Sequence, residues 1–347
     1  MPHGSAKVEA ARELWNLASR DEDPSLRFEV LGEILQAALF GGATDFFLAL
    51  MPQMARLKRD HPEAVNPFTY LWRFKWLTHN LENYPEVPLD RIRQAEAEYE
   101  RELRNAGGSE RTAIYIRWKN AIAMGRLDDT DPLREQFLSM QRDEHADCLA
   151  CEADELVRDA ARRGDHAEAC KRAKAILAGW MRCAEVPHLT LPHLAISAEL
   201  NGEPDNALSH HRKGYPLIRS NIQFVGEVGI HMAYLAASGQ IERGTRLLKT
   251  HIGWLEQNRN PKSHYHFLLG ATAVCQALAG KQQGAVKLPL PSKWLVAWGD
   301  KPLSPADLAE RFEQEGRTLA AAFDRRNGNS WHSDHFDQTL ARIRERN

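Results

Sequence analysis

Apolar residues recur at intervals of three and four along almost the whole chain, whereas alternating runs rich in Val, Ile and Thr are nearly absent. A helix of about 3.6 residues per turn places residues at these intervals on one face, where they can be buried together. In the first segment Val8, Ala11, Leu14, Trp15 and Ala18 form one such face. The pattern predicts an all-α protein with almost no β-strand.

Turn-forming residues divide this pattern into short helices. Asp23, Pro24 and Ser25 end the first helix and begin a second, because Asp and Ser cap helix starts and Pro is tolerated in the first turn. Ser304 and Pro305 mark the start of a C-terminal helix in the same way, and that helix should end near residue 326. Other helices are expected at about residues 25–40, 44–60, 67–82, 89–106, 109–124 and 131–143.

Glycines recur at near-equal intervals in the middle of the chain. Gly125, Gly164, Gly202 and Gly239 follow one another at spacings of 37 to 39 residues. The last three are each followed five positions later by a small residue, namely Ala169, Ala207 and Gly244. Unrelated helix C-caps would also use glycine, but four near-equal intervals favour a repeat of helix, tight turn and helix.

The length of this repeat indicates the architecture. It is slightly longer than the ~34 residues of an ideal tetratricopeptide (TPR) unit. Single hairpins of this kind cannot bury their apolar faces alone, so they stack on one another. We therefore expect a TPR-like α-solenoid of stacked antiparallel helix hairpins.

Two features of the sequence indicate where the chain divides into parts. One is a proline-rich segment, and the other is the point upstream of which the repeat of 37 to 39 residues is no longer visible. The segment Leu288-Pro289-Leu290-Pro291 forbids both a helix and a central strand, so it should separate the repeats from a C-terminal cap. Upstream of about residue 110 the period is blurred. We expect N-terminal helical pairs in 1–110, TPR-like repeats with a metal site in 111–280, a proline-containing loop in 281–303 and C-terminal capping helices in 304–347.

The charge and the cysteine content limit the classes of partner. With 45 basic and 47 acidic residues, the chain has no overall positive field for nucleic acid or an anionic membrane. There is no run of eighteen apolar residues, and the N-terminus lacks the layout of a signal peptide. Five cysteines, an odd number, fit a reducing compartment better than a disulfide framework. We expect a cytoplasmic protein without a membrane partner.

One set of residues has the chemistry of a metal site. Cys148 and Cys151 precede a helix expected at 152–163, and a second helix, at 166–179, ends just before Cys183 and His188. Because the second helix runs back antiparallel to the first, it should bring Cys183 next to Cys151. Three thiolates and an imidazole are donors that structural Zn²⁺ takes in a closed tetrahedral site, which leaves no water to activate.

The sequence leaves other interpretations of these residues open. Cys148 and Cys151 could be half-buried apolar residues, with His188 capping a helix. His145 is the substitute ligand if His188 points away. Cys170 and Cys275 lie among apolar neighbours in mid-helix, so they are assigned to the core.

A concave surface formed by the first helix of each hairpin is the expected place for a partner. The candidate contacts lie on that surface or in a basic and aromatic patch on the second helix of a repeat, for which a solvated outer face is the alternative. They are His193, Ser197, His211, Arg212, Tyr215, Glu227, His231 and Tyr234.

No common nucleotide-binding, hydrolase or metalloprotease motif occurs in the chain. The favoured function is therefore a non-catalytic adaptor or regulatory scaffold that binds a protein or peptide in its groove. A metal-dependent enzyme built on the Cys and His cluster is the first alternative. Nucleic-acid binding through the patch from His210 to Arg219 is the second, and the neutral overall charge argues against it.

Four segments together resemble a group of bacterial tetratricopeptide-repeat proteins of uncharacterised function. They are Cys148-Leu-Ala-Cys151, Cys183-Ala-Glu-Val-Pro-His188, His211-Arg-Lys-Gly-Tyr215 and Phe323-Asp-Arg-Arg-Asn-Gly-Asn329. The similarity covers residues 65–330. It implies an α-solenoid and a shared structural role for Cys148, Cys151, Cys183 and His188, and it implies no reaction.

Overall fold

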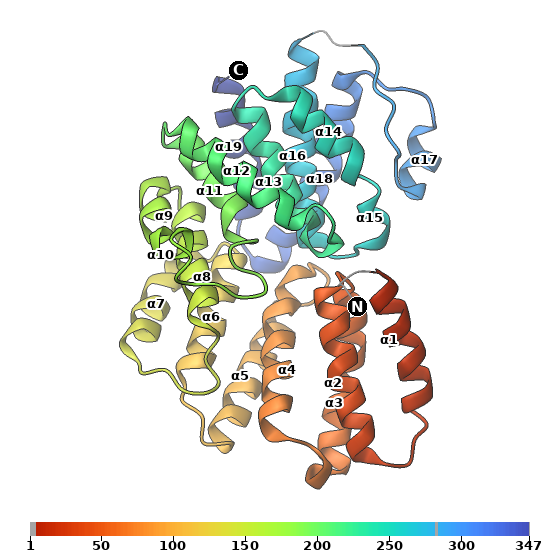
Figure 1. Cartoon of the computed structure of the whole chain (residues 1–347), viewed down its shortest axis with the longest axis vertical. Helices are drawn as coiled ribbons and strands as arrows, with labels where there is room; N and C mark the ends of the chain where they lie inside the picture. The colour runs from red at the N-terminus through yellow and green to blue at the C-terminus, as the bar shows by residue number, and fades with distance from the viewer. Residues whose placement is uncertain (1–4, 282–283, 347) are drawn as a thin grey trace. The chain divides into compact units, whose positions relative to one another are not determined.

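The chain folds almost entirely into helices, as shown in Figure 1 by a computed structural model that describes residues 5–281 and 284–346. Among the described residues the only β structure is an isolated bridge between Val286 and Leu303. This confirms the all-α prediction. None of the helices in the described parts of the chain combines the length and apolarity needed to cross a bilayer. The chain forms two compact units, Met1–Asp147 and Cys148–Asn347.

The first unit contains seven α-helices and three short 3-10 helices within its described residues. Each α-helix packs on the next along the chain. Asp23 and Asn66 cap two of the helices by accepting hydrogen bonds from Ser25 N and Thr69 N. The helices are α1 (Ser5–Ala18), α2 (Pro24–Phe40), α3 (Thr44–Asp60), η1 (Pro62–Ala64), α4 (Pro67–Asn80), η2 (Leu81–Asn83), α5 (Leu89–Asn105), α6 (Arg111–Ala123), η3 (Leu127–Asp129) and α7 (Thr130–Ser139).

A buried lysine ties the last segment of the first unit to α4. Lys75 is 3% exposed, and its Nζ lies 2.6 Å from a carboxylate oxygen of Asp147 and donates to His145 O at 2.9 Å. Burial alone would raise the pKa of Asp147, but Lys75 and Lys119 lower it below its usual range. These contacts hold the end of the first unit, at His145 and Asp147, against α4.

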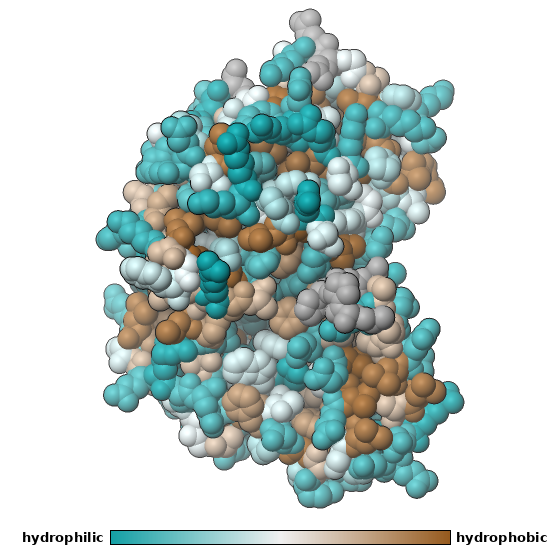
Figure 2. All heavy atoms as spheres, viewed as in Figure 1, coloured by the Kyte–Doolittle hydropathy of each residue, from teal (hydrophilic) through white to brown (hydrophobic). Residues whose placement is uncertain are grey.

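An apolar patch covers the outside of α1 and α2. Figure 2 shows hydrophobic side chains gathered over these helices, where Leu14, Leu17 and Leu26 are exposed. Other side chains of the same helices, Ala11, Phe28 and Leu31, are buried in the core. The expected amphipathic pattern is therefore present but incomplete in this part of the chain.

The second unit contains twelve α-helices and one 3-10 helix within its described residues. They are α8 (Leu149–Arg162), α9 (His166–Arg172), α10 (Lys174–Leu177), α11 (Thr190–Leu200), α12 (Pro204–Ile218), η4 (Ile222–Phe224), α13 (Val225–Ala237), α14 (Ile241–His251), α15 (Trp254–Gln257), α16 (Pro261–Gly280), α17 (Ser292–Trp298), α18 (Pro305–Asn327) and α19 (Trp331–Arg346).

Helix pairs are the building blocks of the second unit. Helix α8 packs on α9, α11 on α12, and α13 on α14, and the first helices of these pairs also pack on one another. The chain reverses between the helices of each pair at Gly164, Gly202 and Gly239, which have φ angles of 78°, 80° and 69°. A residue with a Cβ is strained in this left-handed region, so glycine is required there. The predicted turns are confirmed.

Helices α13 and α16 share the most extensive contact in the unit because glycines let their backbones meet. A Cβ on Gly270 would lie 2.0 Å from Gly229 O, and a Cβ on Gly229 would lie 2.3 Å from His266 O. Around this contact Met232, Phe267 and other apolar side chains of the main core are fully buried. Close backbone approach therefore sets the spacing of these two helices.

Helix α19 returns across the first helices of the pairs. It packs on α13, α16 and α18. Near its end Arg346 pairs with Glu199 of α11, with a nitrogen-to-oxygen distance of 2.6 Å. Helix α19 therefore lies over part of the side of the stack on which we expected an open groove.

Most predicted helices agree with the structure within two or three residues, including the C-terminal helix with its Ser304 cap on Asp307 N at 3.0 Å. Two details differ. The helix expected at 166–179 is divided into α9 and α10, and the expected loop at 281–303 contains α17 between its prolines and Gly299. Gln282 and Gln283 of that loop lie outside the described residues.

Candidate metal centre and polar inner face

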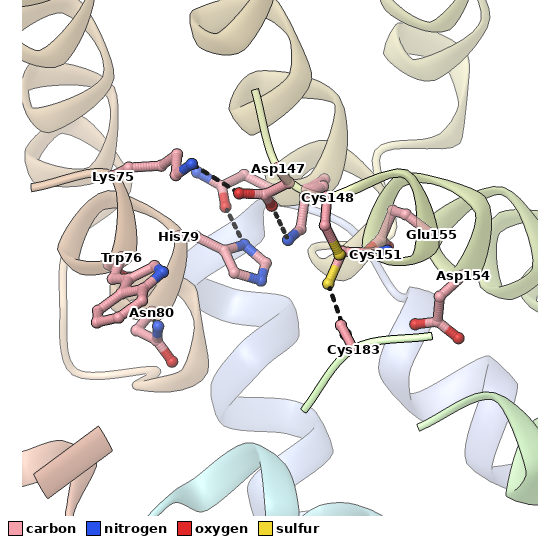
Figure 3. A network of polar contacts seen from close by, with 12 residues as sticks. Lys75, Trp76, His79, Asn80, Asp147, Cys148, Cys151, Asp154, Glu155 and Cys183 are labelled. Atoms are coloured by element: carbon pink, nitrogen blue, oxygen red, sulfur yellow. Dashed lines mark hydrogen bonds and ion pairs between the residues drawn. The ribbon is translucent and has the colours of Figure 1, made fainter. Parts of the chain in front are cut away.

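Three cysteines of the second unit converge at the start of α8. The sulfur atoms of Cys148, Cys151 and Cys183 lie within 4.8 Å of one another, and those of Cys151 and Cys183 are 3.4 Å apart. Figure 3 shows Cys151 on α8 pointing toward Cys183 on the neighbouring loop. The predicted approach of Cys183 to Cys151 by an antiparallel return of the chain is confirmed.

Local backbone structure positions each thiol. Cys148 is the N-cap of α8, and its sulfur accepts a hydrogen bond from Cys151 N at 3.4 Å. Cys183 lies in a tight loop in which its own amide donates to Val186 O and its sulfur accepts from Glu185 N. Amides that point at sulfur stabilise a thiolate, so both ends of the site suit deprotonated cysteines.

Hydrogen bonds make the Cys183 thiol more acidic than an ordinary cysteine. The contact with Cys151, opposed by burial and reinforced by the amides of the Cys183 loop, lowers the pKa of Cys183 to about 5. In contrast, burial raises the pKa of Cys275 to about 12 and also raises that of Cys170. Only the clustered cysteines are therefore disposed to bind a metal, and Cys170 and Cys275 belong to the core as predicted.

The sulfur spacing fits a tetrahedral ion. Zn–S bonds of about 2.3 Å at tetrahedral angles separate the sulfurs by roughly 3.8 Å. The observed range, from 3.4 Å for Cys151 and Cys183 up to 4.8 Å, needs only side-chain adjustments of a few tenths of an ångström to about one ångström. The three residues could therefore hold a Zn²⁺ ion without rearrangement of the backbone.

The prediction that His188 completes this site is not supported by its position. His188 is not part of the group of ligand atoms. Its ring is stacked on Phe224, with centroids 5.7 Å apart and an angle of 14° between the planes, and burial lowers its pKa. The ring is held by an aromatic neighbour 36 positions further along the chain. The substitute candidate, His145, is buried in the first unit against Phe68.

Ionisable side chains from successive helices of the second unit interact across one surface. They are Arg158 and Arg162 on α8, His193 on α11, Glu227 on α13 and His266 on α16, and we call them the inner face. Burial raises the pKa of Glu227 to about 7, although Arg158 opposes this effect. Burial and then Arg162 and Arg158 lower the pKa of His193. These charges influence one another because the helices carry them on the same side.

Several predicted contact residues lie inside the helix pairs and not on a surface. Ser197, His211, His231 and Tyr234 are all buried. Nδ1 of His211 lies 3.2 Å from Nδ1 of His231, so these two rings pair with each other within the unit.

The remaining predicted residues are more accessible. Arg212 is exposed, whereas His193, Tyr215 and Glu227 are partly buried. The Tyr215 hydroxyl lies 2.9 Å from Nε2 of His251. The expected basic patch is weaker than its sequence indicates because its two histidines, His210 and His211, face inward.

A cavity beside the inner face contains residues that the sequence did not single out. Four histidines and three arginines from α8, α9, α11, α16 and α19 line it, namely His166, His193, His266, His335, Arg162, Arg163 and Arg342. Among these seven residues only His193 was an expected contact, and the expected contact Ser197 also lines the cavity. The others are separated by up to about 180 positions, so no local spacing could have grouped them.

No protein-family model matches this chain, and no curated protein matches it either. The geometry of its own residues is therefore the basis for its function.

Proposed function

We propose that this chain is a non-catalytic scaffold with a TPR-like α-solenoid in its second unit, which binds a protein or peptide segment and is stabilised by a structural Zn²⁺ ion. Helix pairs that turn at Gly164, Gly202 and Gly239 support this architecture. Solenoids of this kind use the surface of their first helices for binding.

The observation that carries the proposal is the polar inner face. A helix face that serves only packing is apolar, because burying an ionisable group costs free energy. Glu227 nevertheless remains among partly buried charges, with its pKa raised to about 7, next to His193 and Arg158. Groups with perturbed pKa values cluster at functional sites. A ligand that supplies hydrogen bonds would recover the free energy spent on burying them.

The metal would stabilise one end of this surface. Cys148 and Cys151 belong to the start of α8, and Cys183 belongs to the loop before α11. A shared ion would hold that loop against α8 and so fix the position of the first two inner helices. Three thiolates more than neutralise the two charges of Zn²⁺, which weakens its Lewis acidity and favours a structural role.

Quantitative affinity capture tests the scaffold. Glu227→Gln replaces the inner-face carboxyl group by an amide, and Glu242→Gln makes the same replacement at an exposed position of α14. We expect at least one protein captured by the wild type to be lost from Glu227→Gln and kept by Glu242→Gln. If both variants capture the same set of proteins as the wild type, the inner face does not bind the partner.

A second candidate, a metal-dependent enzyme, is favoured by one observation. Only three thiols form the cluster within the described residues, so one coordination position of a tetrahedral ion is left to another ligand. Catalytic zinc sites have three protein ligands and a water. X-ray absorption of the zinc-loaded protein distinguishes the two cases. Three sulfurs and one exchangeable oxygen would favour the enzyme, whereas a fourth ligand from the protein would favour the scaffold.

A further inference from the structure

The cavity beside the inner face has the size and composition of a binding site. Its volume is about 150 Å³, and a cavity of that size can accept a molecule as large as benzene. Side chains from six helices, α8, α9, α11, α13, α16 and α19, and from the turn after α8 surround it. Trp331 of α19 closes part of its wall and stacks on His335 with ring centroids 4.8 Å apart.

All the ionisable groups of the lining are basic. The arginines are Arg162, Arg163 and Arg342, and the histidines are His166, His193, His266 and His335. No carboxylate is among the described residues that line the cavity. A site with this composition attracts an anion, because every charged donor around it has the same sign.

The positive charge of the arginines is only partly balanced from outside the lining. Arg162 pairs with Glu155 at 3.4 Å, and Arg163 pairs with Asp159 at 2.7 Å. No ion pair involves Arg342 within the part of the chain that the structure describes. Its guanidinium is close to Gly164, where a Cβ would lie 3.9 Å from one of its nitrogens. Arg342 is thus available to a ligand.

The histidines also retain unused hydrogen-bonding capacity. His166 contacts Ser197 Oγ through Nδ1 at 3.3 Å, whereas its buried Nε2 has no hydrogen-bond partner. Burial, with Arg162 as a shared positive neighbour, lowers the pKa values of His193, His266 and His335. An anion in the cavity could accept a hydrogen bond from His166. It would also raise the pKa values of the other three histidines, because a negative charge favours protonated rings.

We propose that this cavity binds a phosphate group, either free phosphate or the phosphoryl group of a small molecule. Donors from α8, α9, α11, α16 and α19 approach from several sides, which suits a tetrahedral oxyanion better than a planar carboxylate. The charge of Arg342, with histidine rings that a bound anion would help to protonate, matches a phosphate that carries one or two negative charges. The volume admits the phosphate and a few attached atoms.

Calorimetric titration of the full chain with inorganic phosphate, at constant ionic strength in chloride, tests the proposal. We expect one saturable site per chain. Arg342→Gln should weaken binding about tenfold or more, because a charge-assisted hydrogen bond to phosphate is lost. Arg344→Gln is the matched control, since it removes the same charge from an exposed position of α19 that does not line the cavity, and it should leave the affinity within about twofold.

Parallel titrations identify the form of the ligand. Tighter binding of O-phosphoserine than of inorganic phosphate would indicate a phosphoryl group on a small molecule, and the reverse order would indicate the free ion. Either order supports the site. Absence of saturable phosphate binding, equal loss in Arg342→Gln and Arg344→Gln, or acetate binding as tight as phosphate would overturn it. The titration uses phosphate alone, so its outcome does not depend on whether the chain binds a protein partner. Phosphate binding can therefore fail or succeed separately from the scaffold function.

Discussion

Replacing Gly270 by Ala tests the close packing of α13 and α16. The new Cβ would lie 2.0 Å from Gly229 O, which is more than 1 Å short of an ordinary contact. The obstructing atom is a backbone oxygen inside a helix, so it cannot turn aside as a side chain could. The two helices would have to separate by about 1 Å along a core that includes Met232 and Phe267.

The expected loss of stability follows from two opposing effects. Overpacking a core costs about 1–3 kcal/mol, and a backbone obstruction belongs at the upper end of that range. Alanine recovers about 1 kcal/mol relative to glycine in a helix. The net loss is therefore roughly 2 kcal/mol, which in a unit of this size lowers the melting temperature by about 4–8 °C.

Scanning calorimetry of the full chain measures this shift. Gly280→Ala is the matched control, because it lies at the end of the same helix and a Cβ there would meet nothing within 4 Å. The control should melt at the wild-type temperature or slightly above it. A Gly270→Ala protein that melts as high as the control would show that the helices are not held at the distance described.

Three further outcomes are expected. Cys183→Ser should lose most of the bound zinc in metal analysis and several kcal/mol of stability, because metal-binding energy is folding energy; a full zinc content would refute the site. His188→Ala should keep its zinc, since that ring is stacked on Phe224; loss of the metal would restore it as a ligand. Burial lowers the pKa values of His211 and His264 to about 4. The unfolded chain takes up protons first, so the free energy of unfolding should fall from about pH 6.5 to pH 4, and denaturant titrations in which stability rises on acidification would contradict this.

The parts of the fold that depend on local rules could be predicted from the sequence. Glycine turns, proline starts and side-chain caps each act within a few residues, so Gly164, Ser304 and Pro305 could be interpreted without a structure. The approach of Cys183 to Cys151 was also predictable, because two antiparallel helices of similar length return the chain to its starting level. Here the geometry of one hairpin was sufficient.

The parts that depend on distant residues could not be predicted. His188 has a spacing that suits a ligand, but Phe224 determines where its ring lies. The inward orientation of His211 depends on His231, which belongs to the next pair. The phosphate cavity needs Arg342 beside His193, and nothing in either local sequence indicates the other. Each of these features is determined by packing between different helix pairs, and the spacing of apolar residues along the sequence does not reveal such packing.

The position of α19 has a consequence for how the second unit is assembled. Arg346 and Glu199 lie 147 positions apart, and contacts of such long range form late because closing a large loop costs entropy. During synthesis the earlier helix pairs would emerge first and stay uncovered until residues 331–346 had been made. For that interval the basic cavity lacks one wall, and a ligand present in the cell could enter before the last helix closes over it.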